Sequence, residues 1–581
     1  NFTSATDSFN TAVGYNAGQA VTTGIRNTLI GGLAGDALTD ADFNVVLGFG
    51  ALSTDTLGSK SVAIGSEALH SQNFTSATNA FNTAVGTNAG YAVTTGIQNT
   101  FIGGLSGDAN TTANNNTAVG YNSFTANTTG TSNVALGAFA LDANTTASNN
   151  TAIGRGALTA NTTGASNIAV GINALVANTT ASNNTAVGAA ALAANTTATG
   201  GVGIGYRALN VNTTGANNTA VGSDALLANT TGNTNTAVGS RTLQANTTGD
   251  RNTAVGFQSL VALNPSSNAD MYNTGVGYDA GAAVTTGVNN TFIGGLAGDA
   301  TDDGANNVAV GKSALSANCG DSNTAIGAGA LNVTTATNNT AVGKDAGILI
   351  TTGVENTIVG ALAADAMTTG DSNTFIGNSS AGTGVVTGDS NTGVGKSSGL
   401  NLTSGSNNLF LGHDAGITGS PGGNITTASN EISLGDENIS AANIQVDWTV
   451  ASDARDKTDF TALDLGLDFV KALAPVTYKW DKRSKYGDKY AEDYDLNDQT
   501  PDGTHKEDWL DIGFKAQEVE ALEIAAGYNK SNSTNLVSSH TDDGKQMGLQ
   551  YSKFVPILVK AIQEQQTLIE SLTARIETLE G

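Results

Sequence analysis

The segment from Val450 to Lys457 gathers side chains that could do covalent chemistry. It holds a serine, Ser452, and a lysine five residues further on, Lys457, with Asp453 and Arg455 between them. A serine hydroxyl attacks a carbonyl only when a base takes its proton, and a lysine amine whose pKa is lowered can be that base. This spacing is common by chance, so the pair identifies no reaction until the elements that position it are known.

The chain changes character after Gly435, and the Ser452 segment lies in this second part. Charged residues become more frequent, and all three tryptophans, Trp448, Trp480 and Trp509, lie there. The pattern predicts a mixed α/β region that ends in a helix. Five spaced blocks follow one another within it, at residues 450–457, 473–480, 513–519, 549–551 and 558–564.

The C-terminal helix carries a heptad seam over about residues 555–580. Its apolar positions step alternately by three and four residues, which indicates a parallel coiled coil. The seam by itself does not decide between two and three strands. Its members are Val555, Leu558, Ile562, Gln565, Ile569, Leu572, Ile576 and Leu579.

The five ordered blocks resemble the intramolecular chaperone auto-processing domain that ends many phage tailspikes, endosialidases and fibres. The resemblance covers the chain from Ser452 to its end and implies that Ser452 is a nucleophile and Lys457 its base. Ser452 would attack the carbonyl of Ala451, so the cut would fall between Ala451 and Ser452. Because attacker and target are adjacent in the chain, orientation supplies much of the rate. Burial or the nearby cation of Arg455 would lower the pKa of Lys457.

Other residues of this region are candidates for supporting roles. Asp453, Gln517 and Glu518 could help to position the site, although packing or surface roles are equally compatible with them. Members of the resembled family often have a histidine where this chain has Asp511, while His505 and His540 lie elsewhere. The resemblance therefore implies a serine–lysine site without a cofactor or metal, and leaves a histidine contribution open.

The first three quarters of the chain consist of a repeated pentad. It runs from Asn10-Thr-Ala-Val-Gly14 to Asn408-Leu-Phe-Leu-Gly412, in 24 copies that are 17 residues apart almost throughout. A short fixed period predicts a solenoid with one coil per repeat. The fourth position is always Val, Ile or Leu, and the fifth is always Gly, which permits a positive φ or a tight corner.

The pentad predicts how each coil is built. We expect the second and fourth positions to face one interior, because side chains alternate along a strand. A small residue three places after the glycine (Ala17, Ala34, Ala51) should be a second inward position, so each coil would have two short strands. Such a thin interior favours several chains side by side.

The repeat resembles the head of YadA-like trimeric autotransporter adhesins, and Ser61-Val-Ala-Ile-Gly65 matches that family's coil literally. The resemblance covers residues 10 to about 412 and implies a trimer of parallel β-rolls. The period differs from the family's shorter coil, so the handedness stays open.

Two sharper interpretations of the repeat are weaker than a structural one. Stacked threonines can bind ice, and turn aspartates such as Asp36, Asp108 and Asp299 can bind calcium. These acids lack the alternating spacing of a calcium loop. We expect asparagine and threonine instead to satisfy backbone groups in the turns.

Composition excludes several classes of protein. The net charge is −26 and no basic stripe is present, which argues against a nucleic-acid partner and against the transcription-factor branch of the chaperone family. No apolar run approaches the roughly 20 residues needed to span a bilayer. Cys319 is the single cysteine, so a disulfide framework within the chain is excluded. The chain opens inside the repeat, so we expect it to be a fragment or processed product that lacks an upstream attachment part.

The fold class that follows is mainly β. A trimeric parallel β-roll of 17-residue coils (1–435) precedes a linker (436–451) and an α/β chaperone domain with a coiled-coil helix (452–581). The predicted function is a phage tail fibre that recognises a host receptor, a carbohydrate being one candidate, and that joins other virion tail proteins. The alternatives are a bacterial trimeric surface adhesin and a polysaccharide-degrading tailspike. The latter needs paired carboxylates in a groove.

Overall fold

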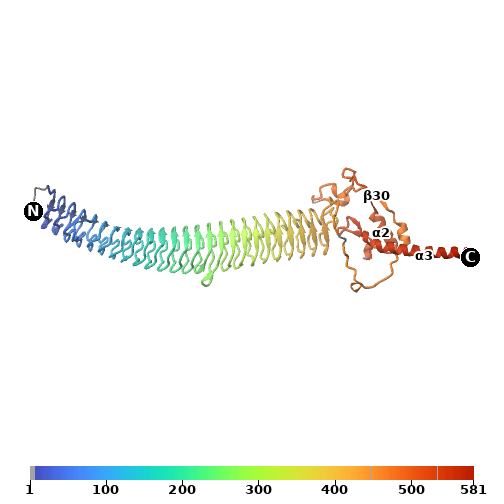
Figure 1. Cartoon of the computed structure of the whole chain (residues 1–581), viewed down its shortest axis with the longest axis horizontal. Helices are drawn as coiled ribbons and strands as arrows, with labels where there is room; N and C mark the ends of the chain where they lie inside the picture. Colours follow the sequence, from blue (N-terminus) through green and yellow to red (C-terminus); the bar gives the residue numbers. More distant parts are fainter. Residues whose placement is uncertain (1–6, 446–447, 492, 533) are drawn as a thin grey trace. The chain divides into compact units, whose positions relative to one another are not determined.

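The computed structural model describes residues 7–445, 448–491, 493–532 and 534–581. It forms two compact units, Asn1–Thr337 and Asn338–Gly581. Stacked coils make up the first unit and the beginning of the second, whose remainder carries the labelled elements β30, α2 and α3 (Figure 1).

Parallel strands mark the successive coils of both units. Those of the first unit are β1 (Thr11–Val13), β2 (Thr28–Ile30), β3 (Val45–Leu47), β4 (Gly58–Ser59), β5 (Val62–Ile64), β6 (Thr78–Asn79), β7 (Thr83–Val85), β8 (Thr100–Ile102), β9 (Thr117–Val119), β10 (Val134–Leu136), β11 (Thr151–Ile153), β12 (Ile168–Val170), β13 (Thr185–Val187), β14 (Val202–Ile204), β15 (Thr219–Val221), β16 (Thr236–Val238), β17 (Gly249–Asp250), β18 (Thr253–Val255), β19 (Ala269–Asp270), β20 (Thr274–Val276), β21 (Thr291–Ile293), β22 (Val308–Val310) and β23 (Thr324–Ile326). Those of the second unit are β24 (Thr340–Val342), β25 (Thr357–Val359), β26 (Thr374–Ile376), β27 (Thr392–Val394), β28 (Leu409–Leu411) and β29 (Ile432–Leu434).

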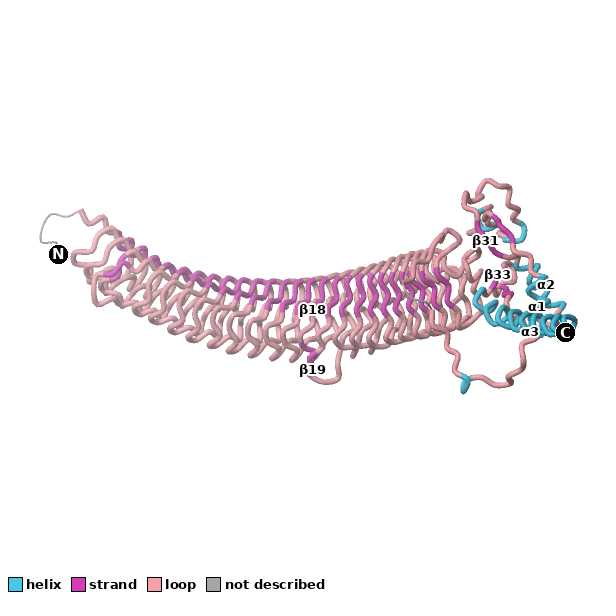
Figure 2. The backbone as a smooth tube through the Cα atoms, turned by 45° about the vertical axis from the view of Figure 1, so that its right-hand side comes forward, coloured by secondary structure: helices cyan, strands magenta, loops and turns pink. Residues whose placement is uncertain are grey.

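The parallel solenoid with one coil per repeat is confirmed, but each coil has one regular strand and not two. Thr151 of β11 pairs with Ile168 of β12, and Figure 2 shows such strands side by side with the rest of each coil as loops and turns. The two-residue pairs β4–β6 and β17–β19 arise only at the longer repeats. Elsewhere the second side cannot be a strand, because Gly154 (φ +134°) and Leu158 (φ +52°) take left-handed backbone conformations.

The predicted interior face of the strand was wrong by one residue. The third pentad position is the buried one, as at Ala152 and Phe101. The fourth position faces outward, and Leu136 is 44% exposed while Ile293 is 40% exposed. A three-residue strand points only its centre inward, and a shift of one residue exchanges the two faces. The aliphatic column therefore lines the outside of each chain.

The predicted small inward position is confirmed, and it shares the core with a leucine. Ala157 and Leu158, three and four places after Gly154, are fully buried. Where the strand centre is Phe101, glycines replace that leucine in its own coil and in the preceding one. A Cβ at Gly107 or Gly90 would lie 2.4 or 2.9 Å from the ring of Phe101. Core volume is thus held nearly constant, as close packing requires.

Buried asparagines satisfy the backbone of the turns, as expected. The Asn150 amide donates to the carbonyl oxygen of Gly164 (2.9 Å), and its Oδ1 accepts the backbone N–H of Asn167 (2.9 Å). A second column links Asn161 to Asn144 (3.0 Å). Since buried amides without partners are costly, these ladders fix the coil-to-coil register locally.

The solenoid continues one coil beyond the last recognised pentad. Strand β29 pairs with β28, and Glu431 takes the place of the ladder asparagine that would follow Asn408. The additional residues fall between Ala415 and Asn424. The Gly399 N–H still donates to Ala415 at the usual place in the next coil, whereas Asn401 reaches its counterpart Asn424 only across a longer step.

The region after the solenoid is the expected small α/β part that ends in a helix. Buried Leu465, Phe469, Val519, Val537, Phe554 and Ile557 form its core. The predicted boundaries at Gly435 and Ser452 stay predictions. The elements are η1 (Ala454–Asp456), α1 (Leu467–Ala472), β30 (Val476–Tyr478), η2 (Arg483–Lys485), η3 (Leu496–Asp498), β31 (Asp511–Gly513), α2 (Ala516–Ala525), η4 (Lys530–Asn532), β32 (Ser538–His540), β33 (Met547–Leu549), η5 (Tyr551–Lys553) and α3 (Phe554–Glu580), with β30–β31 and β32–β33 antiparallel.

Candidate functional site

A short 3₁₀ turn brings the two predicted catalytic side chains together. The Asp453 side chain caps η1 by accepting the N–H of Arg455, and the N–H of Lys457 closes the turn on Ala454. The Lys457 ammonium then lies at 2.6 Å from the hydroxyl oxygen of Ser452 and donates to it. The spacing of five residues is therefore sufficient to place the predicted base and the predicted nucleophile in contact. In this contact the lysine is the donor, so it would have to be neutral before it could accept the proton of the Ser452 hydroxyl.

The two charged residues inside this turn pair with each other. The Arg455 guanidinium contacts the Asp453 carboxylate with Nη2 at 2.5 Å from Oδ2. Hydrogen bonds from Arg455 hold the pKa of Asp453 below its usual range. Asp453 thus offsets the cation that was expected to lower the pKa of Lys457.

The whole segment around the predicted cut is open to solvent in the single chain. All described residues of 448–462 are exposed, and Trp448 (73%) and Phe460 (71%) are apolar side chains among them. Among the described residues, every hydrogen bond of this segment is made within it. No burial therefore acts on Lys457 in the isolated chain.

The other predicted supporting residues, Gln517 and Glu518, make their contacts away from this turn. Glu518 pairs with Lys515 (2.7 Å) at the start of α2. Gln517 lines a cavity of about 490 Å³ with Tyr478 and Trp480. In the described part of the chain, no hydrogen bond or ion pair joins Gln517 or Glu518 to the Ser452 turn.

The histidine-related positions form local contacts of their own. Asp511 accepts hydrogen bonds from Tyr478 and from Trp480, both at 3.3 Å. His540 contacts Glu520 at 2.7 Å, and the ring of His505 packs edge-on against Tyr486. None of these contacts, within the residues that the structure describes, reaches Ser452 or Lys457.

The predicted seam of the C-terminal helix faces solvent in the single chain. The opposite face of α3 packs Phe554, Ile557 and Ala561 against the core. The seam residues Ile562 (64% exposed) and Leu579 (85% exposed) contact no such core. An apolar cavity of about 400 Å³ beside the helix is lined by Leu473, Phe514 and Leu558, among others. This region presents an apolar surface of the kind that marks an interaction site.

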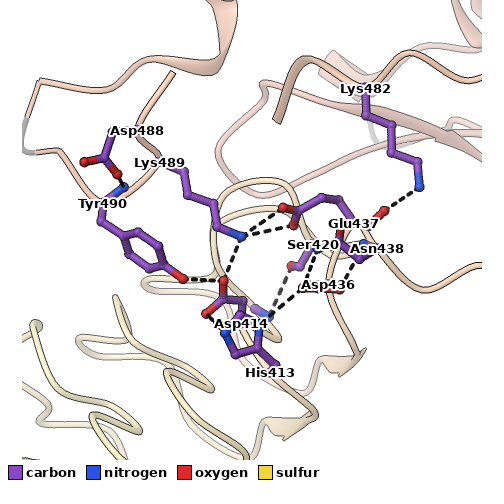
Figure 3. A network of polar contacts seen from close by, with 11 residues as sticks. His413, Asp414, Ser420, Asp436, Glu437, Asn438, Lys482, Asp488, Lys489 and Tyr490 are labelled. Atoms are coloured by element: carbon purple, nitrogen blue, oxygen red, sulfur yellow. Dashed lines mark hydrogen bonds and ion pairs between the residues drawn. The ribbon is translucent and has the colours of Figure 1, made fainter. Parts of the chain in front are cut away.

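A buried ionic cluster that the sequence did not reveal connects the last coils with the region after them. Lys489 contacts Asp414 (2.7 Å) and Glu437 (2.9 Å), and Tyr490 donates to Asp414 at 2.5 Å (Figure 3). Burial alone would lower the pKa of Lys489, but these hydrogen bonds outweigh it and raise the pKa. Burial and the bond to Asp414 raise the pKa of Tyr490 to about 12.

His413, Asp414 and Asp436 are, among the described residues, a group that could hold a metal ion. The His413 ring lies between the two carboxylates, at 3.5 Å from Asp414 and 3.2 Å from Asp436. The ammonium of Lys489 already supplies a cation to Asp414. Asp414 therefore has a cationic partner from the chain itself, while its Oδ1 has no hydrogen-bond partner among the described residues.

Several turn aspartates of the solenoid have a carboxylate oxygen that is buried and unpartnered among the described residues. Asp36, Asp108 and Asp299 each bury one carboxylate oxygen for which the described residues provide no hydrogen-bond partner, and Asp142 and Asp365 do the same. Burial raises the pKa of Asp108 and Asp299.

Of the described helices, none is long and apolar enough to cross a bilayer.

Comparison with known proteins finds a similarity in the C-terminal part of the chain. Residues 452–528 match the family model Peptidase_S74, described as the chaperone of endosialidase. No curated protein matches the chain. The match implies self-cleavage by this region and a chaperone role within its own chain. The chain thus joins a long parallel β-solenoid to a C-terminal region similar to the chaperone of endosialidase.

Proposed function

We propose that the chain is a tail-fibre protein of phage type whose C-terminal region nucleates trimerisation and then cuts itself off between Ala451 and Ser452. One observation carries this proposal: the family match begins at Ser452, the residue that would become the new N-terminus. The 2.6 Å contact between Lys457 and Ser452 supports the same assignment.

The proposed reaction is an acyl transfer followed by hydrolysis. Neutral Lys457 takes the proton of the Ser452 hydroxyl while Oγ attacks the carbonyl carbon of Ala451. The peptide C–N bond breaks, the proton passes to the departing amine of Ser452, and an ester joins Ala451 to Oγ. Water then hydrolyses this ester and leaves a carboxylate on Ala451. Lys457 must lose its charge first, which requires burial that the exposed single chain does not provide.

The proposed trimer would supply that burial and would cover the outward strand face. Parallel sheets are ordinarily covered on both faces. In this chain the fourth pentad position forms a continuous, partly exposed apolar column, because Ile153, Val170 and Val187 are half-buried and stack in register. Two further copies of this chain carry the same column with the same period. They are therefore the partners that fit against it along its whole length. The exposed seam of α3 supports association at the other end of the chain.

A denaturing gel of full-length protein beside Ser452→Ala and Lys457→Ala tests the cleavage. Wild type should give two fragments, with the smaller beginning at Ser452 by N-terminal sequencing. Both variants should stay whole, and Asp456→Ala, in the same exposed turn, is the control that should still be cut. Another N-terminus, or cleavage of both variants, would refute the assignment.

Light scattering of the uncut Ser452→Ala protein tests the trimer. Three chains of 58.1 kDa should give about 174 kDa. Ile204→Asp on the outward column should weaken the trimer, whereas Thr197→Asp on an exposed turn should not. A monomer at micromolar concentration would contradict the shared apolar face.

Attachment to other virion proteins and binding of a host receptor belong to the same proposal. A cell-binding assay with the mature fibre would test the binding of a receptor.

A further inference from the structure

The last coil of the solenoid departs from the repeat where the C-terminal region touches it. The extra residues between Ala415 and Asn424 include two glycines that meet side chains of that region. A Cβ at Gly419 would lie 2.5 Å from the Cβ of Ser484, and one at Gly423 would lie 2.5 Å from that of Thr541. The Asn424 N–H also donates to Asp543 at 3.3 Å. The insertion is thus shaped for close backbone approach.

The ionic cluster around Lys489 is the polar centre of this contact. The Lys489 side chain is 13% exposed, and those of Asp414 and Glu437 are 0% and 6% exposed. Lys482 adds a hydrogen bond to the carbonyl oxygen of Glu437 at 2.5 Å (Figure 3). Two carboxylates around one ammonium in a desolvated site are far more dependent on each other than an exposed pair.

The two sides of this contact belong to different fragments once the chain is cut. Asp414, Glu437 and the insertion precede Ala451, whereas Lys482, Lys489 and Tyr490 follow Ser452. Cutting the exposed segment between them breaks none of these contacts, since the described residues of that segment bond only among themselves.

We propose that this contact, defined as the Lys489 dock, holds the C-terminal fragment on the last coils of the solenoid after the chain has been cut. The natural cut at Ala451 is part of the proposed function, and the inference rests on it. The dock itself is argued from the contacts described above. The partner that fits the terminal coil is therefore the chain's own cleaved C-terminal fragment. Cleavage removes the covalent link, and separation of the fragments requires the dock to open.

Two forms of the full-length protein test the dock. The first is wild type after self-cleavage. The second is Ser452→Ala with a protease recognition sequence inserted between Thr449 and Val450, cut by the added protease. Both should show two bands on a denaturing gel but elute together in gel filtration at micromolar concentration. If wild type stays uncut, the proposed function fails while the second form still measures the dock.

Lys489→Met should raise the dissociation constant of the fragments about 100-fold or more, because it leaves two buried carboxylates without their cation. Lys485→Met is the matched control in the same loop, since the described residues give its side chain no ion pair or hydrogen bond. Glu437→Gln is a second variant that keeps the shape of the site and should weaken the dock in the same direction. Circular dichroism checks that each variant is folded.

Separation of the wild-type fragments at micromolar concentration would overturn the proposal. So would retention by folded Lys489→Met and Glu437→Gln as tight as that of Lys485→Met. Release of the fragment by all three variants alike would also refute the role of Lys489, because the loop and not its charge would then be responsible.

Discussion

The solenoid and the C-terminal region solve the problem of burial in opposite ways. In the solenoid, Ala152, Leu158 and Asn150 contact residues of their own coil or of the next, and the pattern recurs from coil to coil. In the C-terminal region, Leu465 and Phe469 pack with Phe554 and Ile557, which lie far along the chain. The first core is repetitive and local, and the second is unique.

This difference explains why the two regions need each other in the proposed fibre. Coils that are nearly identical can pair with a neighbouring chain displaced by a whole repeat at little cost, which is a route to misassembly. A region with a unique core has no repeat by which a neighbouring chain could be displaced. The unique region can therefore set the alignment that the repetitive region cannot set for itself.

Removing residues 452–581 should have the largest effect. A chain that ends at Ala451 should aggregate or form mixed oligomers, because nothing then aligns the three solenoids. Ser452→Ala should still give a uniform trimer, since it removes only the cut, although we expect it to resist detergent less than the cleaved rod. Light scattering measures the oligomers, and gels run in detergent measure the resistance. A uniform soluble trimer from the shortened chain would break the comparison.

Loss of the buried carboxylate of Glu523 should unfold the C-terminal region selectively. This side chain is 0% exposed and accepts the N–H groups of Leu536, Val537 and Ser538. Glu523→Ala should cost about 3 kcal/mol, because buried donors lose a charged acceptor. Thermal unfolding of Ser452→Ala with and without this change measures the loss. Exposed Glu577→Ala should change stability by less than about 0.5 kcal/mol, and an equal loss in both would contradict the explanation.

A compensating pair in the solenoid should show how local its core is. Gly107→Leu alone should cost about 2–3 kcal/mol, because the added side chain meets the ring of Phe101. Combining it with Phe101→Ala recreates the Ala152 and Leu158 arrangement and should recover most of that loss. Hydrogen exchange of the affected coils measures the coupling. If the double variant instead lost the sum of the two single losses, the side chains at positions 101 and 107 would not compensate for each other within the coil.

Replacing one turn aspartate should give the smallest effect, a gain. The equivalent Asn210 donates to the carbonyl oxygen of Ala190 (2.9 Å), whereas Asp142 has an oxygen without a donor among the described residues. Asp142→Asn should therefore stabilise the solenoid by about 1 kcal/mol at pH 7, and Asp303→Asn on an exposed turn is the control.

The pH dependence of this variant gives a second measurement. Burial raises the pKa of Asp142 above its ordinary 3.8. The native state then holds this proton more tightly than the unfolded chain, so its contribution to stability is full below about pH 4 and is lost as pH rises through the raised pKa. The advantage of Asp142→Asn should shrink on acidification. An advantage that stays constant down to pH 3 would exclude this cause.

The sequence by itself determined the solenoid, its period, the helix with its seam and the pair Ser452 and Lys457. Each of these depends on residues close together in the chain: the pentad, the heptad, and a turn between two residues five positions apart that brings Nζ to 2.6 Å from Oγ. Local geometry allows few alternatives at such separations. The catalytic roles of the pair and the trimer stay proposals.

Tertiary structure alone decided which strand face is buried, the additional strand β29 and the Lys489 dock. Alternation defines two faces but not which one points inward, and here the central residue of the three-residue solenoid strands after β1 is enclosed while the aliphatic residue after it faces out. Strand β29 was hidden because Glu431 replaces the asparagine and the step from Asn408 is longer than the repeat. Asp414 and Lys489 lie far apart in the chain, so only the folded chain brings the two charges out of water together.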